Sequence, residues 1–456
     1  MRNKLLLTLA LGCALPIPAR AFCGFYVGKA GAELFNKASQ VVLARDGDRT
    51  IVTMSNDFQG NLTEFALVVP VPSVITKDQV HVGERRFIER LDAYSAPRLV
   101  EYNDPDPCMQ MEYKRRAAGA PMAKKASASE DVAERAKSLG VTIEAQYTVG
   151  EYDIVILSAK QSEGLTQWLI ETGYNIPPRA EAALQPYIKS NMKFFVAKVN
   201  LKEQAKTGFT YLRPIQIAYE SPKFMLPIRL GMVNSQGPQD LIIFALTRRG
   251  RVESTNYRTV KIPTGQEIPQ YVRNEFPSFY KALFQHSWEQ ENKKALHTEY
   301  VWDTGWCDPC AAQPLTPDEL RGVGVFWLDE NTAQPGGPQQ PAYRRFIRGP
   351  GGGAPVLTRL HVRYDADHFP EDLVFQETGD RSNFQGRYVL RNPWRGAASC
   401  DAATSYFRQL DERHKRELQS LVELTGWPAE EIAKKMGEDA PGKIKEAAPW
   451  YKRIWK

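Results

Sequence analysis

The sequence predicts an α+β fold with mostly antiparallel sheets, packed helices, two sheet-containing modules and a helical C-terminal segment. Short apolar runs bounded by Pro, Gly or Asn recur between residues 193 and 263, which is typical of antiparallel strands. Helical periodicity occurs only in separate blocks, so strand and helix do not alternate as in a parallel α/β fold. The chain has 456 residues, 43% hydrophobic and 25% charged, which suits two or three globular modules.

The N-terminal module is predicted over residues 22–192, and its first two strands cover 40–44 and 50–54. Asp46-Gly47 lies between them, and because glycine tolerates a positive φ, this pair favours a hairpin turn. A further strand is expected at 62–71, and a second strand pair around Gly150. Helices are expected at 84–91, 163–172 and 180–189. Residues 114–140 are rich in Ala, Lys and Ser, and we expect a mobile insertion there because they hold little apolar material to bury.

The second module is predicted over residues 193–400 and is rich in β-structure. Pro214 and Pro227 fall inside two of its apolar runs, so we expect those strands at sheet edges or bulges. The runs at 357–364 and 373–377 are expected to pair as a hairpin. A helix rich in aromatic residues is expected at 271–294, and a surface loop of Gln, Pro and Gly at 331–355.

The C-terminal segment, residues 401–456, has leucines at helical spacing, and Pro428 is expected to start one more short helix. Its last residues mix Trp450, Tyr451 and Trp455 with lysines and an arginine. Such a tail can lie on a lipid or partner surface, or its aromatic rings can dock on the protein's own core.

Residues 1–21 have the pattern of a secretory signal peptide. Arg2 and Lys4 give a basic start, an apolar stretch follows, and Ala19-Arg20-Ala21 offers small residues at the two positions that signal peptidase inspects. The apolar stretch is shorter than the roughly 20 residues that span a bilayer, so cleavage after Ala21 is favoured over an uncleaved anchor or a lipoprotein signal at Cys13. We therefore expect a soluble periplasmic or secreted protein.

Loss of the signal peptide also changes the charge. Arg2, Lys4 and Arg20 leave with it, so the formal net charge falls from +6 to +3 (6 minus 3). This small excess makes nucleic acid a poor candidate partner.

The cysteines outside the signal peptide are Cys23, Cys108, Cys307, Cys310 and Cys400. An oxidising compartment favours disulfides among them, and the odd number leaves at least one free or paired outside the chain. Sequence cannot choose among the pairings. We prefer Cys23 with Cys108, and a second bridge drawn from the other three.

One of these cysteine pairs also suggests redox chemistry. Trp306-Cys307-Asp308-Pro309-Cys310 resembles a thioredoxin motif, in which one thiol has a lowered pKa. A redox cysteine usually precedes a substantial helix, whereas Pro314 follows this motif closely and the next helix meets Gly322 quickly. A structural turn or bridge is the favoured interpretation, and thiol–disulfide exchange is the alternative.

A second candidate site is a metal centre. Its potential ligands are His361, Asp365, Asp367 and His368, which cluster around one predicted hairpin. Asp and His in a turn are more often there for hydrogen bonding. Metal-assisted hydrolysis is therefore an alternative, and no cofactor is expected.

Several long stretches resemble a bacterial family known only as domain of unknown function 2330. They include FCGFYVGKA, FALVVPVPSVITKDQV, KFMLPIRLGMVN, GPQDLIIFALTRRGRVESTNYRTVKIP, GWCDPCAAQPLTPDEL and TRLHVRYDADHFPEDLVFQ. The resemblance implies an exported protein of Gram-negative bacteria and no particular reaction, so no catalytic residues follow from it.

Together these observations favour a non-catalytic binding or scaffold module of the cell envelope that has an envelope protein partner. The alternative is an envelope enzyme, acting either through Cys307 and Cys310 or through the His361–His368 hairpin.

Overall fold

The computed structural model describes residues 25–28, 35–59, 65–108, 141–171, 179–207, 211–234, 237–308, 313–328, 353–396 and 400–443. The expected signal peptide, the insertion at 114–140, nearly all of the loop at 331–355 and the aromatic C-terminal tail lie outside these residues. Within the described ranges, no helix is both long and apolar enough to cross a membrane.

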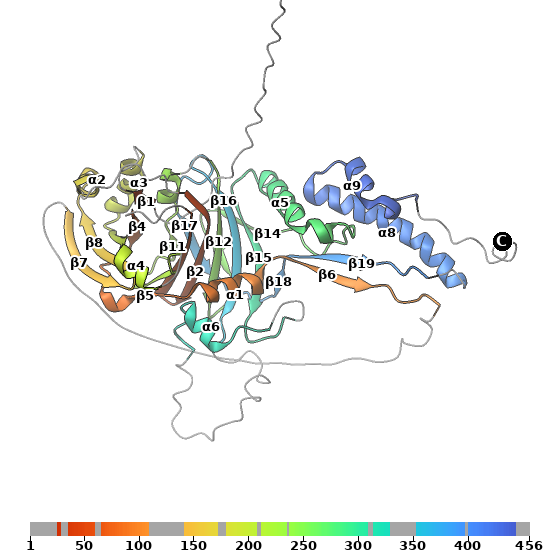
Figure 1. Ribbon diagram of the computed structural model, residues 1–456, viewed down its shortest axis with the longest axis horizontal. Helices are drawn as coiled ribbons and strands as arrows, with labels where there is room; N and C mark the ends of the chain where they lie inside the picture. Colours follow the sequence, from red (N-terminus) through yellow and green to blue (C-terminus); the bar gives the residue numbers. More distant parts are fainter. Residues whose placement is uncertain are drawn as a thin grey trace, which may run out of the picture.

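Two sheets packed face to face form the centre of the molecule (Figure 1). In order across the sheet, the larger one contains β14 (Arg258–Lys261), β15 (Ala295–Asp303), β16 (Val356–Tyr364), β12 (Gln239–Thr247), β2 (Phe35–Asp46), β3 (Arg49–Gln59), β10 (Ile215–Glu220) and β5 (Val80–Val82), with β18 (Phe384–Gln385) paired to β15. The smaller one contains β1 (Phe25–Gly28), β4 (Phe65–Val71), β9 (Lys193–Val199), β8 (Tyr152–Ala159) and β7 (Val141–Val149).

Helices cover the outer faces of both sheets. On the larger sheet these are α1 (Arg85–Ser95) and α6 (Pro317–Gly322), and on the smaller sheet α2 (Ser162–Glu171) and α3 (Ala180–Lys189). Strand β2 shows how the sequence produces these layers. Val41 and Leu43 belong to the core between the sheets, whereas Val42 and Ala44 belong to the core under α1 and α6. Because successive side chains alternate between faces, a strand buried on both sides is a continuous apolar run.

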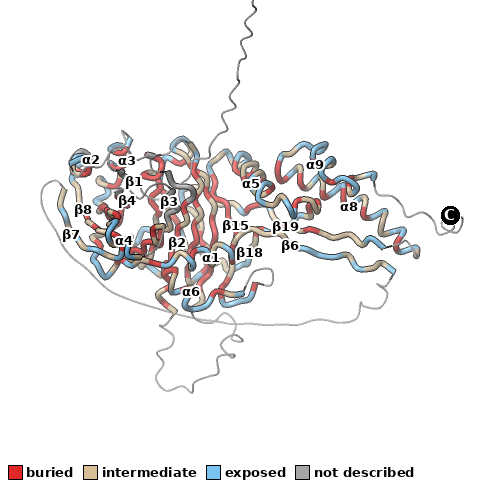
Figure 2. The backbone as a smooth tube through the Cα atoms, in the orientation of Figure 1, coloured by how far each residue is buried: buried red, intermediate tan, exposed pale blue. Residues whose placement is uncertain are grey.

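A third part of the molecule extends to one side of the sheets (Figure 1). It consists of a parallel strand pair, β6 (Arg98–Asn103) with β19 (Arg387–Asn392), and of the helices α5 (Val272–Gln290), α8 (Asp401–Thr425) and α9 (Ala429–Met436). These helices and β19 share one apolar core. Figure 2 shows that buried residues concentrate in the central strands of the two sheets and are sparser along β6 and α8.

A disulfide ties this part of the chain together. Cys108 follows β6, Cys400 is the N-cap residue of α8, and their Cα atoms are 6.2 Å apart across a sequence separation of 292 residues. The preferred pairing of Cys23 with Cys108 is therefore wrong. The parallel pairing of β6 with β19 brings Cys108 close to Cys400 at the start of α8. No local sequence pattern predicts this proximity.

The predicted fold class is confirmed, as are the helices at α1, α2, α3 and α5 and the short helix after Pro428. Both predicted turns are confirmed too. β2 and β3 pair across Gly47 (φ 60°), and β7 and β8 pair across Gly150 (φ 54°).

Two expectations based on local pattern fail. β16 does not pair with β17 (Leu373–Glu377), because β16 already lies between β12 and β15, and β17 pairs instead with β11 (Met225–Leu226) and β13 (Val252–Ser254). Pro214 does not place its strand at an edge, since β10 begins one residue later and lies between β3 and β5. The expectation for Pro227 is confirmed, because Pro227 directly follows β11, which lies at the edge of the three-stranded sheet.

The predicted module boundary at residue 192 does not separate the two sheets. β2 and β3 precede it and belong to the larger sheet, whereas β9 follows it and belongs to the smaller one. Each sheet therefore contains strands from both sides of that residue.

Candidate functional site

Two groups of ionisable side chains stand out among the described residues, and the first lies on the outer face of the larger sheet, where α5 packs. We call this group the Glu299 network; its members are Asp92, Asp240, Tyr280, Glu299, Arg359, His361 and Arg363. A β-bulge in β15 between Thr298 and Tyr300 makes Glu299 the extra residue of the strand. Bulges re-aim side chains, and this one directs the Glu299 carboxylate at both Arg359 and His361 of β16.

The Glu299 carboxylate is fully satisfied. Oε2 accepts from Arg359 Nε at 2.6 Å, Oε1 lies 2.8 Å from His361 Nδ1, and the Tyr280 hydroxyl donates to Oε1 as well. Burial raises the pKa of Glu299, but His361 and Arg359 outweigh it and bring the pKa down to about 2. Glu299 is therefore a buried anion held by two cations.

His361 is enclosed in the same way. Its Nε2 lies 3.2 Å from Asp240 Oδ1, and Arg363 makes two 2.8 Å hydrogen bonds to the same carboxylate. Phe284 of α5 stacks on the imidazole, with ring centroids 3.6 Å apart. Burial lowers the pKa of His361, and the carboxylates of Glu299 and Asp240 reverse this and raise it. Both ring nitrogens are occupied, so His361 has no nitrogen left for a metal.

The other predicted metal ligands form a local turn. Asp365 Oδ1 accepts from the backbone N–H groups of Asp367 and His368 at 3.0 and 2.9 Å, and it lies 2.7 Å from His368 Nδ1. Across the described residues, no group of three or more His, Cys, Asp or Glu side chains is arranged to hold a metal ion. The four predicted ligands therefore do not come together as one site.

The cysteine motif is described only in part. Cys307 lies four residues after β15 and carries a free, exposed thiol. Cys310 and Cys23 lie outside the described residues. Thiol–disulfide exchange at this motif stays a prediction.

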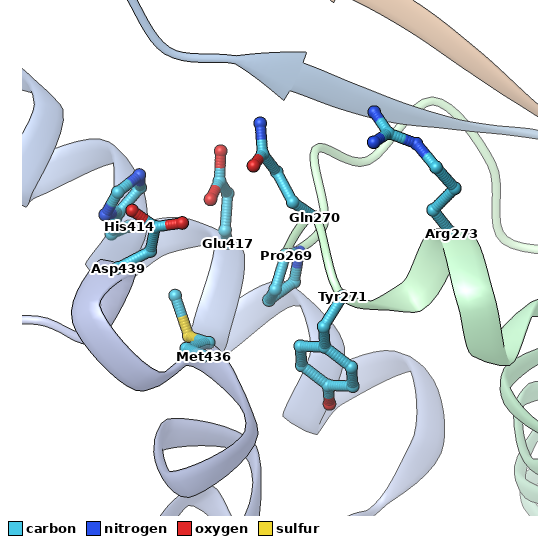
Figure 3. Close-up of a pocket in the computed structure, with 8 residues that line it drawn as sticks. All are labelled: Pro269, Gln270, Tyr271, Arg273, His414, Glu417, Met436 and Asp439. Carbon is cyan, nitrogen blue, oxygen red and sulfur yellow. The ribbon is translucent and has the colours of Figure 1, made fainter. Parts of the chain in front are cut away.

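The second group lines a pocket between the turn that precedes α5 and the helices α8 and α9, with a volume of about 250 Å³. We call it the Glu417 pocket (Figure 3). It is lined by Pro269, Gln270, Tyr271, Arg273, His414, Glu417, Met436 and Asp439. In Figure 3 the Glu417 carboxylate lies in the middle of this group, with His414 and Asp439 on one side and Gln270 on the other.

Local structure explains how these residues meet. His414 and Glu417 are three residues apart on α8, which places them on the same helix face. Gly437, with φ 62°, ends α9 directly after Met436 and turns the chain toward Asp439. The Gln270 amide is fixed from the other side, because its Nε2 donates to the Arg391 carbonyl oxygen and to Asn392 Oδ1 of β19.

The pocket contains buried polar atoms without hydrogen-bond partners. His414 and Glu417 are each only 3% exposed, yet His414 Nδ1 and Glu417 Oε1 have no hydrogen-bond partner. Glu417 Oε1 forms an ion pair with Arg413 Nε at 3.3 Å, but no hydrogen bond joins the two atoms. Such groups cost free energy when they are buried and unsatisfied, so their presence beside a cavity indicates a site built for something other than stability.

Their protonation states follow from burial. Burial raises the pKa of Glu417 to about 8, although Arg413 acts in the opposite direction. Burial lowers the pKa of His414, and Asp439 offsets only part of this. At neutral pH the histidine is therefore neutral and the glutamate is close to its titration point. A carboxyl poised in this way inside a cleft is typical of functional sites.

Most of the chain matches a known protein family. A family model for uncharacterized proteins conserved in bacteria (DUF2330) matches residues 17–376, well over half of the chain. The chain belongs to this family. No curated protein matches it, and no solved structure does. The resemblance found in the sequence is thereby confirmed.

The residues matched by the DUF2330 model include one of the two sites fully and the other only in part. They include every member of the Glu299 network, whereas they include only the Pro269–Arg273 side of the Glu417 pocket. His414, Glu417, Met436 and Asp439 lie beyond the last matched residue. The pocket thus forms where the DUF2330 region meets the C-terminal helices.

Sequence reasoning missed His414 and Glu417, although a signal was present. The buried residues of α8 include Leu410, His414, Glu417, Leu421 and Leu424, with spacings of three or four residues. That is the apolar stripe of a helix that faces a core. Two adjacent positions on this stripe hold ionisable residues, which are rarely buried without a partner.

Proposed function

We propose that this DUF2330 member is an exported protein of the cell envelope that works as a binding module, with the Glu417 pocket as its ligand site. A protein partner in the envelope belongs to the same proposal. The observation that carries the proposal is the pair of buried acceptors without a hydrogen bond, Glu417 Oε1 and His414 Nδ1, beside a cavity of about 250 Å³. A ligand that satisfies them would recover the cost of their burial.

The disulfide supports the cellular location. Disulfides form and persist in oxidising compartments such as the bacterial periplasm. Cys108 and Cys400 are held at bonding distance by two elements far apart in the sequence. This agrees with the signal-peptide pattern of residues 1–21.

The proposal is tested on protein from the native envelope fraction. Intact mass spectrometry should show a chain that begins at Phe22 and contains the Cys108–Cys400 disulfide. Native mass spectrometry after incubation with a small-molecule extract of the envelope should then show a non-covalent adduct. A full-length chain in the cytosolic fraction contradicts export, and the absence of any adduct contradicts the binding role.

An enzymatic alternative is tested with the same preparation. The exposed thiol of Cys307 keeps disulfide exchange open to experiment, and insulin reduction that is lost in Cys307→Ser would replace the binding proposal.

A further inference from the structure

We propose that the Glu417 pocket binds a small organic ammonium ion, with the Glu417 carboxylate as its counter-charge. This inference rests on the proposed function, because it names the ligand class of the same pocket. Three features carry it: the charge balance around the pocket, the hydrogen-bonding character of its walls, and its size.

The charge balance near Glu417 leaves one carboxylate in excess. Four other acidic groups there each have an arginine as partner. These pairs are Glu101 with Arg273, Asp104 with Arg413, Glu267 with Arg391, and Asp439 with Arg395. Lys435 of α9, which lies over the Tyr271 ring, is neutralised by Glu275 of α5 at 2.7 Å.

Arg413 is shared between two carboxylates. Its Nη1 donates to Asp104 Oδ2 at 2.6 Å, and its Nε forms an ion pair with Glu417 Oε1 at 3.3 Å without a hydrogen bond. With Glu417 ionised, these five carboxylates therefore face four arginines, which leaves one negative charge in excess. Either a proton or a bound cation can balance it.

The polar groups that face the pocket are acceptors. Glu417 Oε1 is a carboxylate oxygen without a hydrogen bond. His414 forms a hydrogen bond with the Asp439 backbone, which leaves the neutral ring's Nδ1 to accept. The Gln270 amide hydrogens are engaged with β19, and its amide oxygen lies on the Glu417 side in Figure 3. An ammonium group has three donors and no acceptor, so it matches this set.

Other ligand classes fit less well. An anion would meet Glu417 and Asp439, while the only lining cation, Arg273, already donates to both carboxylate oxygens of Glu101. A metal ion would need a ligand group that the described residues do not form. The cavity of about 250 Å³ lies below the roughly 300–1,000 Å³ of drug-sized sites. Pro269, the Tyr271 ring and Met436 offer apolar contact to a short carbon chain.

Binding of a cation must displace the proton from Glu417, because the ammonium and the proton compete for one carboxylate. Affinity should therefore rise between pH 7 and pH 9 by about tenfold, the change in the ionised fraction of a carboxyl with a pKa of about 8. The charged groups that face Glu417 are Arg413, Glu267, Asp439 and Asp104.

The experiment uses the purified full chain and three probes of equal length: n-butylamine, n-butanol and butyrate. Binding is followed by calorimetry and by the ¹³C-methyl resonance of Met436. We expect saturable binding of butylamine only, about tenfold tighter at pH 9 than at pH 7. Glu417→Gln should abolish it, whereas Glu423→Gln, an exposed glutamate on the same helix, should keep it.

The outcomes separate this inference from the proposed function. Binding of butanol or butyrate in place of butylamine overturns the ammonium assignment, as does butylamine binding that survives Glu417→Gln. An adduct from envelope extract without butylamine binding also overturns it, and leaves the pocket as a ligand site. If neither extract nor probes bind, both proposals fail.

Discussion

The Glu299 network and the Glu417 pocket are built from the same residue types, yet they differ in every respect that matters for function. In the network, each buried charge meets an opposite charge at hydrogen-bonding distance, and an aromatic helix face covers the set. In the pocket, Glu417 shares Arg413 with Asp104, its Oε1 makes no hydrogen bond, and a cavity lies beside it. Fully paired buried charges hold the fold together, whereas the incomplete pairing beside a cavity is the basis of the proposed binding site.

The largest effect is expected from breaking the network. Glu299→Gln should lower the free energy of unfolding by about 3–5 kcal/mol, because it leaves Arg359 and His361 buried with one carboxylate fewer. Guanidinium denaturation at pH 7 measures this. The exposed Glu289→Gln on α5 is the matched control, with an expected change below about 0.5 kcal/mol. Similar values for the two variants would contradict a structural role for the network.

The network should also be sensitive to acid. The pKa of Glu299 is about 2 in the folded protein, below its ordinary value of 4.5. The stabilisation that this implies is fully present above pH 4.5 and is lost as the pH falls through about 2. Denaturation midpoints of parent and Glu299→Gln should therefore converge on acidification. A constant difference down to pH 2 would show that the carboxylate charge is not the source of the effect.

The next effect concerns the disulfide that joins the end of β6 to the start of α8, the helix that carries Glu417. Cys400→Ser should cost about 2–4 kcal/mol, since the disulfide closes a very long loop. Because Cys400 caps α8, hydrogen exchange should rise first at the start of that helix and leave the sheets protected. Cys307→Ser removes a free thiol and serves as the control. Unchanged protection of α8 in Cys400→Ser would mean that packing alone holds the helix in place.

The sequence predicted the features that depend on neighbouring residues, and it did not predict those that depend on residues far apart in the chain. The hairpin at Gly47 and the amphipathic helix α1 depend on local chemistry, and both were predicted. The partners of β16 and of Cys108 depend on residues far along the chain, and both predictions were wrong. His361 resembled a metal ligand because its spacing from His368 was visible, whereas its real partners, Glu299 and Asp240, lie 62 and 121 residues away.

The smallest expected effect is that of Glu417→Gln on stability. This substitution should stabilise the protein, whereas Glu299→Gln should destabilise it. Glu417 has a folded pKa of about 8, above its ordinary 4.5. The folded protein keeps a proton that the unfolded chain releases between these values, so the parent loses stability as the pH rises from about 4.5 to 8. Glu417→Gln removes this loss. At pH 9 it should stabilise the protein by about 2 kcal/mol, less than full burial of a charge costs because the pocket admits water.

Thermal and guanidinium denaturation of parent and Glu417→Gln between pH 5 and pH 9 measure this difference, and the other titrating groups cancel in the comparison. The curves should coincide near pH 5 and separate as the pH rises. Glu423→Gln, exposed on the same helix, should follow the parent throughout. A Glu417→Gln variant that is less stable than the parent at pH 9 would show that Arg413 pairs productively with Glu417, which would make the pocket a second structural network. A Glu417→Gln variant that is more stable but no longer binds the ligand would show that the protein gives up stability at this site in order to bind.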